Sequence, residues 1–114
     1  MHPLPPLTEL RAFEAVARRM SFKAAADELG VTATAISHQI RLLEQFCGQR
    51  LFRRRPRPIT LTEAGLKLYP VINDGFSRFA EAITATRQQA TQQPLRVTAT
   101  NAFAARWLVP RLPH

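Results

Sequence analysis

The chain has 114 residues, with 16 Lys and Arg against 8 Asp and Glu and a formal net charge of +8. Its single cysteine excludes an internal disulfide, and no apolar run is long enough to span a bilayer. This length predicts one domain with an appended piece, and the basic excess predicts an anionic partner, either nucleic acid or an anionic membrane surface.

The first segment, residues 1–6, holds three prolines and is expected to be disordered. Thr8 is then expected to cap a first helix that runs to about Arg19. Apolar side chains at helical spacing line one face of this helix: Leu10, Phe13, Val16 and Ala17. We expect that face to pack across the segment that follows.

The stretch from Ser21 to Phe46 predicts two helices joined by a tight turn. Ser21 and Thr32 are good N-caps for the two helices, and Gly30 suits a left-handed C-terminal cap between them. Val31, in the turn, is expected to point inward. The three helices together predict a core that includes Phe22, Leu29, Ile36 and Ile40.

The second helix of this pair has two chemically different faces. At about 100° per residue, one side collects the apolar Ile36, Ile40 and Leu43. The other side collects small or hydrogen-bonding side chains, which suit close approach to base edges in a major groove: Ala33, Thr34, Ser37, His38 and Arg41. This arrangement indicates a DNA-binding helix-turn-helix, and the alternatives are an ordinary αα-hairpin in a helical bundle and, for His38, a plain surface histidine.

The segment after that helix is basic and free of acids from Gln45 to Thr62. Cys47 is expected to be a small hydrophobe at the helix end rather than a redox sensor. Two prolines exclude a helix over the following residues, and residues 59–61 predict a short strand, so a basic β-hairpin or wing is expected. Its arginines are candidates for the minor groove: Arg53, Arg54, Arg55 and Arg57. The alternatives are a solvated basic loop and a membrane-surface patch.

A long helix is expected from Thr62, as its cap, to about Gln92. Its seam residues recur at alternating three- and four-residue steps, which is typical of a heptad repeat: Tyr69, Ile72, Phe76, Phe79, Ile83, Thr86 and Ala90. The seam predicts a dimerisation helix, and the alternative is that it packs back on the chain's own core. Pro70 is expected to kink this helix or to separate its first turns.

The last residues, 95–114, predict one strand followed by the beginning of a helix. Such a fragment cannot bury itself, so it indicates the start of a second domain and is expected to be poorly ordered.

The order and spacing of these motifs resemble the N-terminal part of a LysR-type transcriptional regulator. The resemblance rests on L-x-x-F-x-x-V from Leu10, SFKAAADELGVT from Ser21, AISHQIRLLE from Ala35, LFRR from Leu51 and LTEAG from Leu61. The segments SHQI, LFRR and WLVPRL are most similar to the branch that contains the glycine-cleavage activator.

The resemblance implies a mainly α fold, in which a winged helix-turn-helix (residues 1–61, a three-helix core plus a short β wing) precedes a long dimerisation helix (62–93). Residues 94–114 would begin a truncated effector domain built like a periplasmic binding protein. Family members pair through antiparallel linker helices, usually form tetramers, and bind interrupted palindromes.

The resemblance also implies roles for individual residues. The family's base contacts fall on Ala33, Thr34, Ser37 and His38, and its wing contact falls on Arg53. Many members have Gln at the position of Ala33, so this chain lacks a bidentate adenine reader there; at position 38 relatives often have Arg.

The expected function is therefore a cytoplasmic, nucleoid-associated, sequence-specific DNA-binding regulator that acts on double-stranded DNA as a homodimer or homotetramer. The alternative is a helical dimerisation module that pairs with full-length relatives without regulating on its own. A small-molecule effector is expected only where the full effector domain is present, with Thr100 and Asn101 as candidate contacts.

No nucleophile–base pair, phosphate-cradling glycine loop or metal-ligand spacing occurs in the sequence, so no enzyme, cofactor or metal site is expected. The expected DNA-binding residues are Ser21, Thr32, Ala33, Thr34, Ser37, His38, Arg41, Arg53, Arg54, Arg55 and Arg57, and the expected dimerisation residues are Tyr69, Ile72, Phe76, Phe79, Ile83 and Thr86.

Overall fold

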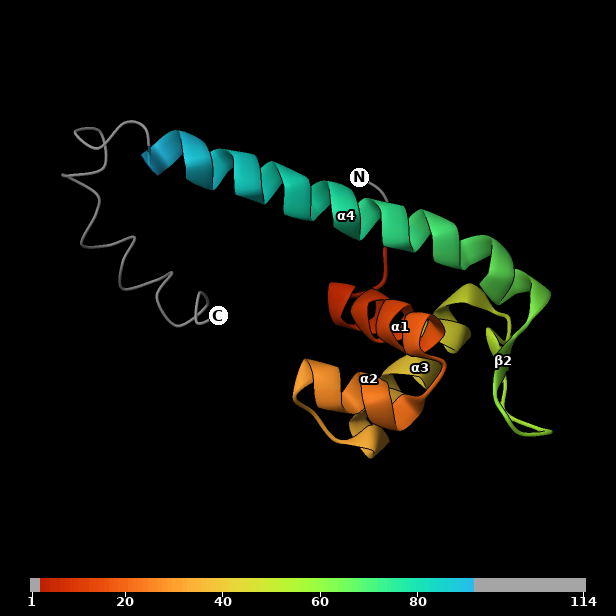
Figure 1. Ribbon diagram of the computed structural model, residues 1–114. Coiled ribbons are helices and arrows are strands. Elements are labelled where there is room, and N and C mark those ends of the chain that lie inside the picture. The colour runs from red at the N-terminus through yellow and green to blue at the C-terminus, as the bar shows by residue number, and fades with distance from the viewer. Residues whose placement is uncertain (1–2, 92–114) are drawn as a thin grey trace. The chain divides into compact units, whose positions relative to one another are not determined.

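The computed structural model describes residues 3–91, which form four helices and one small antiparallel sheet (Figure 1). The elements in chain order are α1 (Leu7–Arg19), α2 (Phe22–Leu29), α3 (Ala33–Cys47), β1 (Phe52–Arg53), β2 (Thr60–Leu61) and α4 (Glu63–Thr91). The predicted mainly helical fold with a short β wing is confirmed. The chain divides into two compact units that meet within α4, between Gly75 and Phe76.

Local capping chemistry sets the ends of α2 and α3. The Oγ of Ser21 and the Oγ1 of Thr32 each accept a hydrogen bond, at 3.0 Å, from the backbone N–H three residues further on. Gly30 and Gly48 end these helices with φ of 72° and 74°, a left-handed conformation that is cheap only for glycine. The predicted caps at Ser21, Gly30 and Thr32 are confirmed.

The start of α1 differs from the prediction. The helix begins at Leu7 after Pro6, no side chain caps it, and Thr8 lies inside its first turn, so the predicted Thr8 cap is wrong. The carbonyl of Pro6 instead accepts from the N–H of Glu9 at 3.0 Å. Pro5 is buried, so the disorder expected for residues 1–6 does not extend to it.

The core lies where α1, α3 and the wing meet. The rings of Phe13 and Phe52 pack with centroids 5.5 Å apart. The largest fully buried side chains are Phe13, Phe52, Ile36, Ile40, Leu43, Leu51 and Val16. α2 is short and buries mainly Ala25 and Ala26, so Phe22 and Leu29 are half-buried rather than central.

Two apolar residues, Val31 and Cys47, lie outside the core, and for Val31 this differs from the expectation. Val31 is 46% exposed, because it belongs to the turn, where its N–H closes α2 on the carbonyl of Ala26 at 3.0 Å and its side chain faces outward. Cys47 is exposed as well, at the last residue of α3. Partial burial of the Cys47 thiol raises its pKa, and the nearby Glu44 carboxylate raises this pKa further by a smaller amount.

A buried carboxylate joins α3 to the wing. The Oε2 of Glu44 accepts from the backbone N–H of Leu51 at 2.8 Å and of Phe52 at 3.3 Å. β1 then pairs antiparallel with β2, with Phe52 opposite Leu61. The wing is thereby anchored at its base to the C-terminal half of α3.

The first turn of α4 packs against the segment that leads into β1. Thr62 caps the helix as predicted, since its Oγ1 accepts from the N–H of Gly65 at 3.1 Å, and its hydroxyl donates to the carbonyl of Arg50 at 2.6 Å. A Cβ at Gly65 would lie 2.3 Å from the carbonyl oxygen of Leu51, so only glycine fits. α4 continues through Pro70 to Thr91, so of the two outcomes expected at Pro70, a kink or a separation of the first turns, the separation does not occur. Over residues 3–91, none of the helices combines the length and the hydropathy that crossing a membrane requires.

Candidate nucleic-acid interface

The two predicted faces of α3 are present. Ile36, Ile40 and Leu43 are at most 2% exposed and face the core. On the other side Ser37 is half-buried, and the remaining predicted reading residues are exposed: Ala33, Thr34, His38 and Arg41. An exposed helical face with these short side chains allows the backbone of α3 to come close to a major groove.

Two predicted DNA-binding residues, Ser21 and Thr32, stand at the N-terminal ends of α2 and α3. Each side-chain oxygen already accepts from its own helix, so each hydroxyl retains its hydrogen for donation. The free N–H groups and the dipole at a helix N-terminus favour an anion such as a phosphate.

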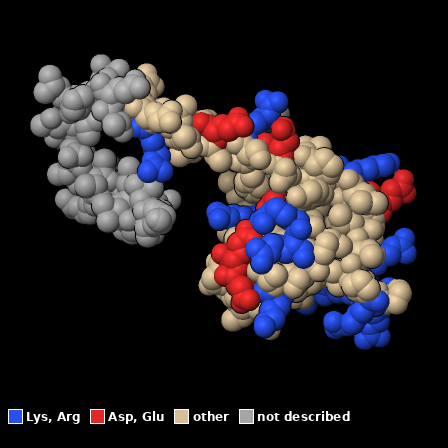
Figure 2. Space-filling view, in the orientation of Figure 1, with Lys and Arg blue, Asp and Glu red and all other residues tan. Residues whose placement is uncertain are grey.

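The wing carries concentrated positive charge. Arg53, Arg55 and Arg57 are exposed and have no carboxylate partner among residues 3–91. Figure 2 shows Lys and Arg side chains gathered at the lower right, where Figure 1 has the wing, with no Asp or Glu among them. Arg50, at the base of the wing, differs because its Nε lies 3.8 Å from the Glu44 carboxylate.

Arg54 is set apart from the other wing arginines. Its guanidinium lies 4.7 Å from the centre of the Phe22 ring, and its Nη1 donates to the Oγ of Ser37 at 3.3 Å. Its Nε is buried and has no hydrogen-bond partner among residues 3–91. Sequence reasoning grouped the four wing arginines together, whereas the structure turns Arg54 back toward α2 and α3.

A groove of about 570 Å³ lies where the wing meets the N-terminal ends of α2 and α3. The groove therefore brings together residues that are distant in sequence: Ser21, Lys23, Ala33, Thr34, Ser37, Arg54 and Arg57. All were predicted to bind DNA except Lys23, an isolated exposed lysine whose position beside the wing only the fold reveals. Five predicted residues do not line this groove: Thr32, His38, Arg41, Arg53 and Arg55.

The predicted dimerisation seam is uneven in exposure. Tyr69 is half-buried, with its ring edge-on to Phe13 at 6.5 Å, so the alternative of packing on the chain's own core holds for this residue. Phe79 and Ile83 are 56% and 60% exposed. Ile72 and Phe76 are intermediate, and Thr86 is exposed. The seam thus leaves an uncovered apolar stripe on the part of α4 that follows Gly75.

Other candidate sites receive less support. The proposed effector contacts Thr100 and Asn101 lie outside the described residues, as does the predicted strand and helix of residues 95–114. Within residues 3–91, no group of three or more His, Cys, Asp or Glu side chains is arranged to hold a metal ion.

Residues 7–66 match the family described as "Bacterial regulatory helix-turn-helix protein, lysR family". The chain is 48% identical over 109 residues to the glycine cleavage system transcriptional activator of Escherichia coli (strain K12), a match that covers 96% of this chain and 36% of the relative. It is 45% identical over 112 residues to the HTH-type transcriptional activator AmpR of Pseudomonas aeruginosa, covering 98% of this chain and 38% of the relative. The chain thus spans little more than a third of the length of these curated relatives.

Solved structures show the same fold. The DNA-binding domain of BenM, in complex with catB site 1 DNA, superposes with a TM-score of 0.71 at 32% identity, over 75% of this chain and 97% of that one. Vibrio fischeri DarR in complex with DNA gives a TM-score of 0.68 at 27% identity, over 79% of this chain and 31% of that one. The family match covers more than half of the sequence, and the winged helix-turn-helix agrees with it. The chain belongs to the LysR family of bacterial helix-turn-helix transcription regulators.

Proposed function

We propose that this chain binds double-stranded DNA sequence-specifically, as the DNA-binding part of a LysR-type regulator. The observation that carries the proposal is the groove in which the N-terminal ends of α2 and α3 meet a wing with uncompensated arginines. One surface thus offers both short side chains for base edges and cations for the phosphate backbone, the two kinds of contact that specific recognition combines.

The residues divide into three roles. Ser37 and His38 are the proposed readers of base edges, and Ala33 and Thr34 offer methyl groups for thymine. The helix-cap residues, the exposed arginine of α3 and the exposed wing arginines are proposed to hold phosphates or enter the minor groove: Ser21, Thr32, Arg41, Arg53, Arg55 and Arg57. Arg54 is proposed to support Ser37, to which it donates a hydrogen bond.

A homodimer or a higher oligomer on an interrupted palindrome is proposed from the apolar stripe on α4. Phe79 and Ile83 are more than half exposed, and a second copy would bury them. The proposed limits are residues 1–61 for DNA binding, 62–93 for pairing and 94–114 for the start of an effector domain. A small-molecule effector is proposed only for a chain that contains that whole domain.

The reading role is tested with duplexes that the chain selects from a random-sequence library. Ser37→Ala and His38→Ala should each weaken binding to the selected duplex by about 1–3 kcal/mol and change binding to scrambled duplex little, because base contacts carry the discrimination. Fluorescence anisotropy at fixed salt measures both affinities.

A matched control is Gln39→Ala, because Gln39 is on the same helix but lines a different cleft, beside α1. It should leave both affinities unchanged. Equal losses on selected and scrambled duplex in the Ser37 and His38 variants would contradict base reading by these residues.

The same apolar stripe favours a second function, in which the chain acts mainly as a helical pairing module for full-length relatives. The two functions make different predictions about salt. Specific DNA binding gives an affinity that falls steeply with salt and exceeds that for scrambled duplex, whereas a pairing module alone shows neither property.

A further inference from the structure

α4 contains a point of weakness close to its start. Pro70 has no N–H, so the carbonyl of Leu66 lacks the hydrogen bond that the helical ladder would otherwise provide. The helix nevertheless continues through this position. Because the missing hydrogen bond lowers the local resistance to bending, contacts that brace Pro70 have a large effect on the direction of the helix.

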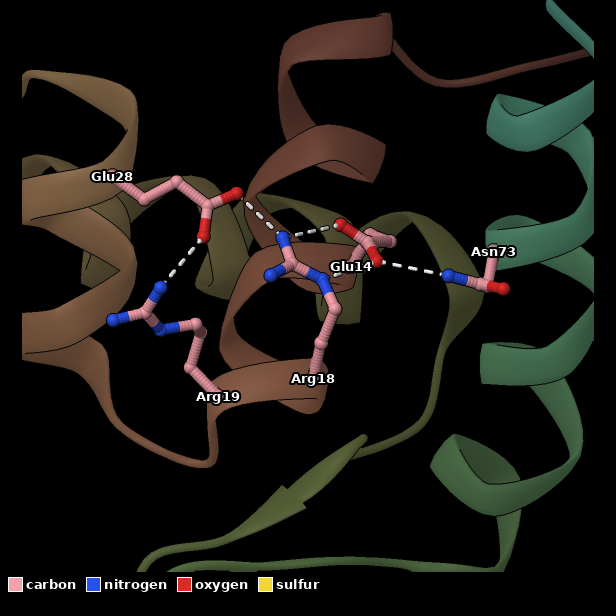
Figure 3. Close-up of polar contacts among 5 residues, drawn as sticks. All are labelled: Glu14, Arg18, Arg19, Glu28 and Asn73. Atoms are coloured by element: carbon pink, nitrogen blue, oxygen red, sulfur yellow. Dashed lines mark hydrogen bonds and ion pairs between the residues drawn. The ribbon is translucent and has the colours of Figure 1, made fainter. Parts of the chain in front are cut away.

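Two such contacts lie on either side of Pro70, and both reach neighbouring residues of α1. Before the proline, the ring of Tyr69 packs edge-on against Phe13 at 6.5 Å. After it, the Nδ2 of Asn73 donates to the Oε2 of Glu14 at 3.0 Å (Figure 3). Fifty-nine residues separate Asn73 from its acceptor, so this bond joins the pairing helix to the first helix of the DNA-binding unit.

The acceptor is itself held in place. Arg18 donates to both oxygens of Glu14, through Nε at 2.9 Å and Nη2 at 3.2 Å, and its Nη2 also reaches the Glu28 carboxylate on α2. The Glu14 side chain is only 12% exposed. Figure 3 shows the resulting chain of polar contacts from α4 through α1 to α2. Asn73 therefore binds a fixed, charged acceptor, which makes a stronger hydrogen bond than a mobile or neutral one.

We infer that Asn73 is a positioning residue whose hydrogen bond to Glu14 latches α4 across Pro70 and so fixes the direction in which the pairing helix leaves the DNA-binding unit. The consequence for DNA rests on the proposed function. In a dimer, this direction sets the separation of the two recognition helices and therefore the half-site spacing that the protein accepts. One base pair of spacing corresponds to a rotation of roughly 35° about the duplex, so even a modest freedom at Pro70 relaxes the preference.

Four variants test the latch. Asn73→Asp removes the donor and places a second carboxylate against Glu14, and Asn73→Ala removes the donor without adding charge. The double variant Glu14→Gln with Asn73→Asp exchanges donor and acceptor and restores an amide–carboxylate pair. Ser77→Asp is the matched control, because it adds the same charge one turn further along α4 at an exposed position without a hydrogen-bond partner among residues 3–91.

The first measurement requires neither DNA nor a dimer. Cys47 is exposed and is the only cysteine in the sequence, and a Cβ added at Gly75 would meet nothing within 4 Å, so Cys47 and Gly75→Cys accept a pair of spin labels. With labelled protein diluted in unlabelled protein, the width of the distance distribution reports the freedom at Pro70. The width should grow by about twofold in Asn73→Asp and Asn73→Ala, since a released hinge absorbs larger backbone changes. It should return to the parent value in the exchanged pair and stay there in Ser77→Asp.

A proline replacement separates a latch from a general loss of stability. Pro70→Ala restores the missing helical hydrogen bond, so adding Asn73→Asp to it should widen the distribution much less than Asn73→Asp does alone. An unchanged width in Asn73→Asp, or an equal widening with and without Pro70, would overturn the latch.

The second measurement concerns spacing. Selected duplexes are rebuilt with the half-sites moved apart by one and two base pairs. The parent and Ser77→Asp should lose about tenfold in affinity with the shift, and Asn73→Asp about threefold or less, because a flexible connection restores simultaneous engagement of both half-sites. An unaltered spacing preference despite a wider distance distribution would overturn the role in specificity. Failure of the parent to select any duplex would overturn the proposed function, while the distance measurement would still decide the latch.

Discussion

Glu44 illustrates how one buried side chain organises the wing. Its carboxylate accepts two backbone N–H groups at the entrance to β1, and the side chain is 9% exposed. No local sequence signal marks this role, because the two donors lie seven and eight residues away, beyond the end of α3 at the start of the wing. For that reason the sequence alone does not indicate the role of Glu44.

Replacing Glu44 should destabilise the fold. Glu44→Ala leaves the N–H groups of Leu51 and Phe52 without their acceptor and should lower the free energy of unfolding by about 2 kcal/mol. Glu44→Gln retains one acceptor oxygen and should cost less. Urea denaturation measures both, with Gln45→Ala, at the exposed neighbouring position, as a control that should behave as the parent does. A parent-like Glu44→Ala would show that other groups satisfy these donors.

The Glu14–Arg18–Glu28 contacts predict a pH dependence of stability. The hydrogen bond from Arg18 lowers the pKa of both Glu14 and Glu28 below their ordinary value of 4.5, against the opposing effect of burial. The pKa of each carboxyl is lower in the folded state than in the unfolded state. The ionised carboxylates therefore stabilise the fold fully at pH values above the unfolded-state pKa, and this stabilisation is lost as the pH falls through the folded-state pKa.

Arg18→Met should therefore lower the urea midpoint near pH 7, and the difference from the parent should shrink in acid as the pH falls through the folded-state pKa values of Glu14 and Glu28. The effect should be modest, since Arg18 is 38% exposed and solvent screens the pair. A constant difference between parent and variant at neutral and acidic pH would show that Arg18 acts through packing rather than through charge.

At the scale of elements, most helix ends could be predicted from the sequence, because they depend on local interactions. Capping hydroxyls and left-handed glycines act within a few residues, so Ser21, Gly30, Thr32 and Thr62 are visible in the sequence alone. The features that sequence reasoning missed depend on distant partners. Arg54 turns back because Phe22 and Ser37 lie beside it only in the folded chain, and the Asn73–Glu14 bond likewise needs the fold. The exposed Val31 has a related cause, because a turn side chain follows the path of the backbone rather than its own hydropathy.

The wing should act as an electrostatic element. Each phosphate contact that is removed should flatten the slope of log affinity against log salt by about one unit, so replacing Arg53, Arg55 and Arg57 by Ala should give a clearly shallower salt dependence. Binding to selected and scrambled duplex should weaken together, as measured by anisotropy titrations at several salt concentrations.

The control for the wing removes the same charge elsewhere. Arg11, Lys67 and Arg87 are exposed and lie on α1 and α4, and replacing them by Ala should leave the slope close to that of the parent. Equal slopes for the two triple variants would show that net charge, rather than the wing, determines the salt dependence.

At the scale of the whole molecule, the exposed stripe on α4 should determine assembly. Burying Phe76, Phe79 and Ile83 against a second copy is worth about 1.5–3 kcal/mol per side chain before the cost of association. Phe79→Asp should therefore yield monomers in sedimentation experiments, while circular dichroism remains mainly helical because Phe79 is 56% exposed and is not among the buried core residues. Affinity for a duplex with both half-sites should fall steeply, since each half-site must then be bound alone.

Ala80→Asp is the matched control, because Ala80 is exposed, lies next to Phe79 and is off the seam. It should retain the assembly state of the parent. A dimeric Phe79→Asp variant would place the interface elsewhere on the chain.

The contact at Gly65 limits how this protein can be recombined with its relatives. The first turn of α4 lies so close to the carbonyl of Leu51 that no side chain fits between them, and Thr62 is bonded to the backbone that leads into β1. The wing and the first turn of α4 must therefore be complementary in shape. A chimera joined between β2 and α4 would combine halves of a single packed junction, whereas a chimera joined after Gly65 would transfer that junction intact. For exchanging DNA specificity between regulators of this family, the transferable module extends past the wing into the helix.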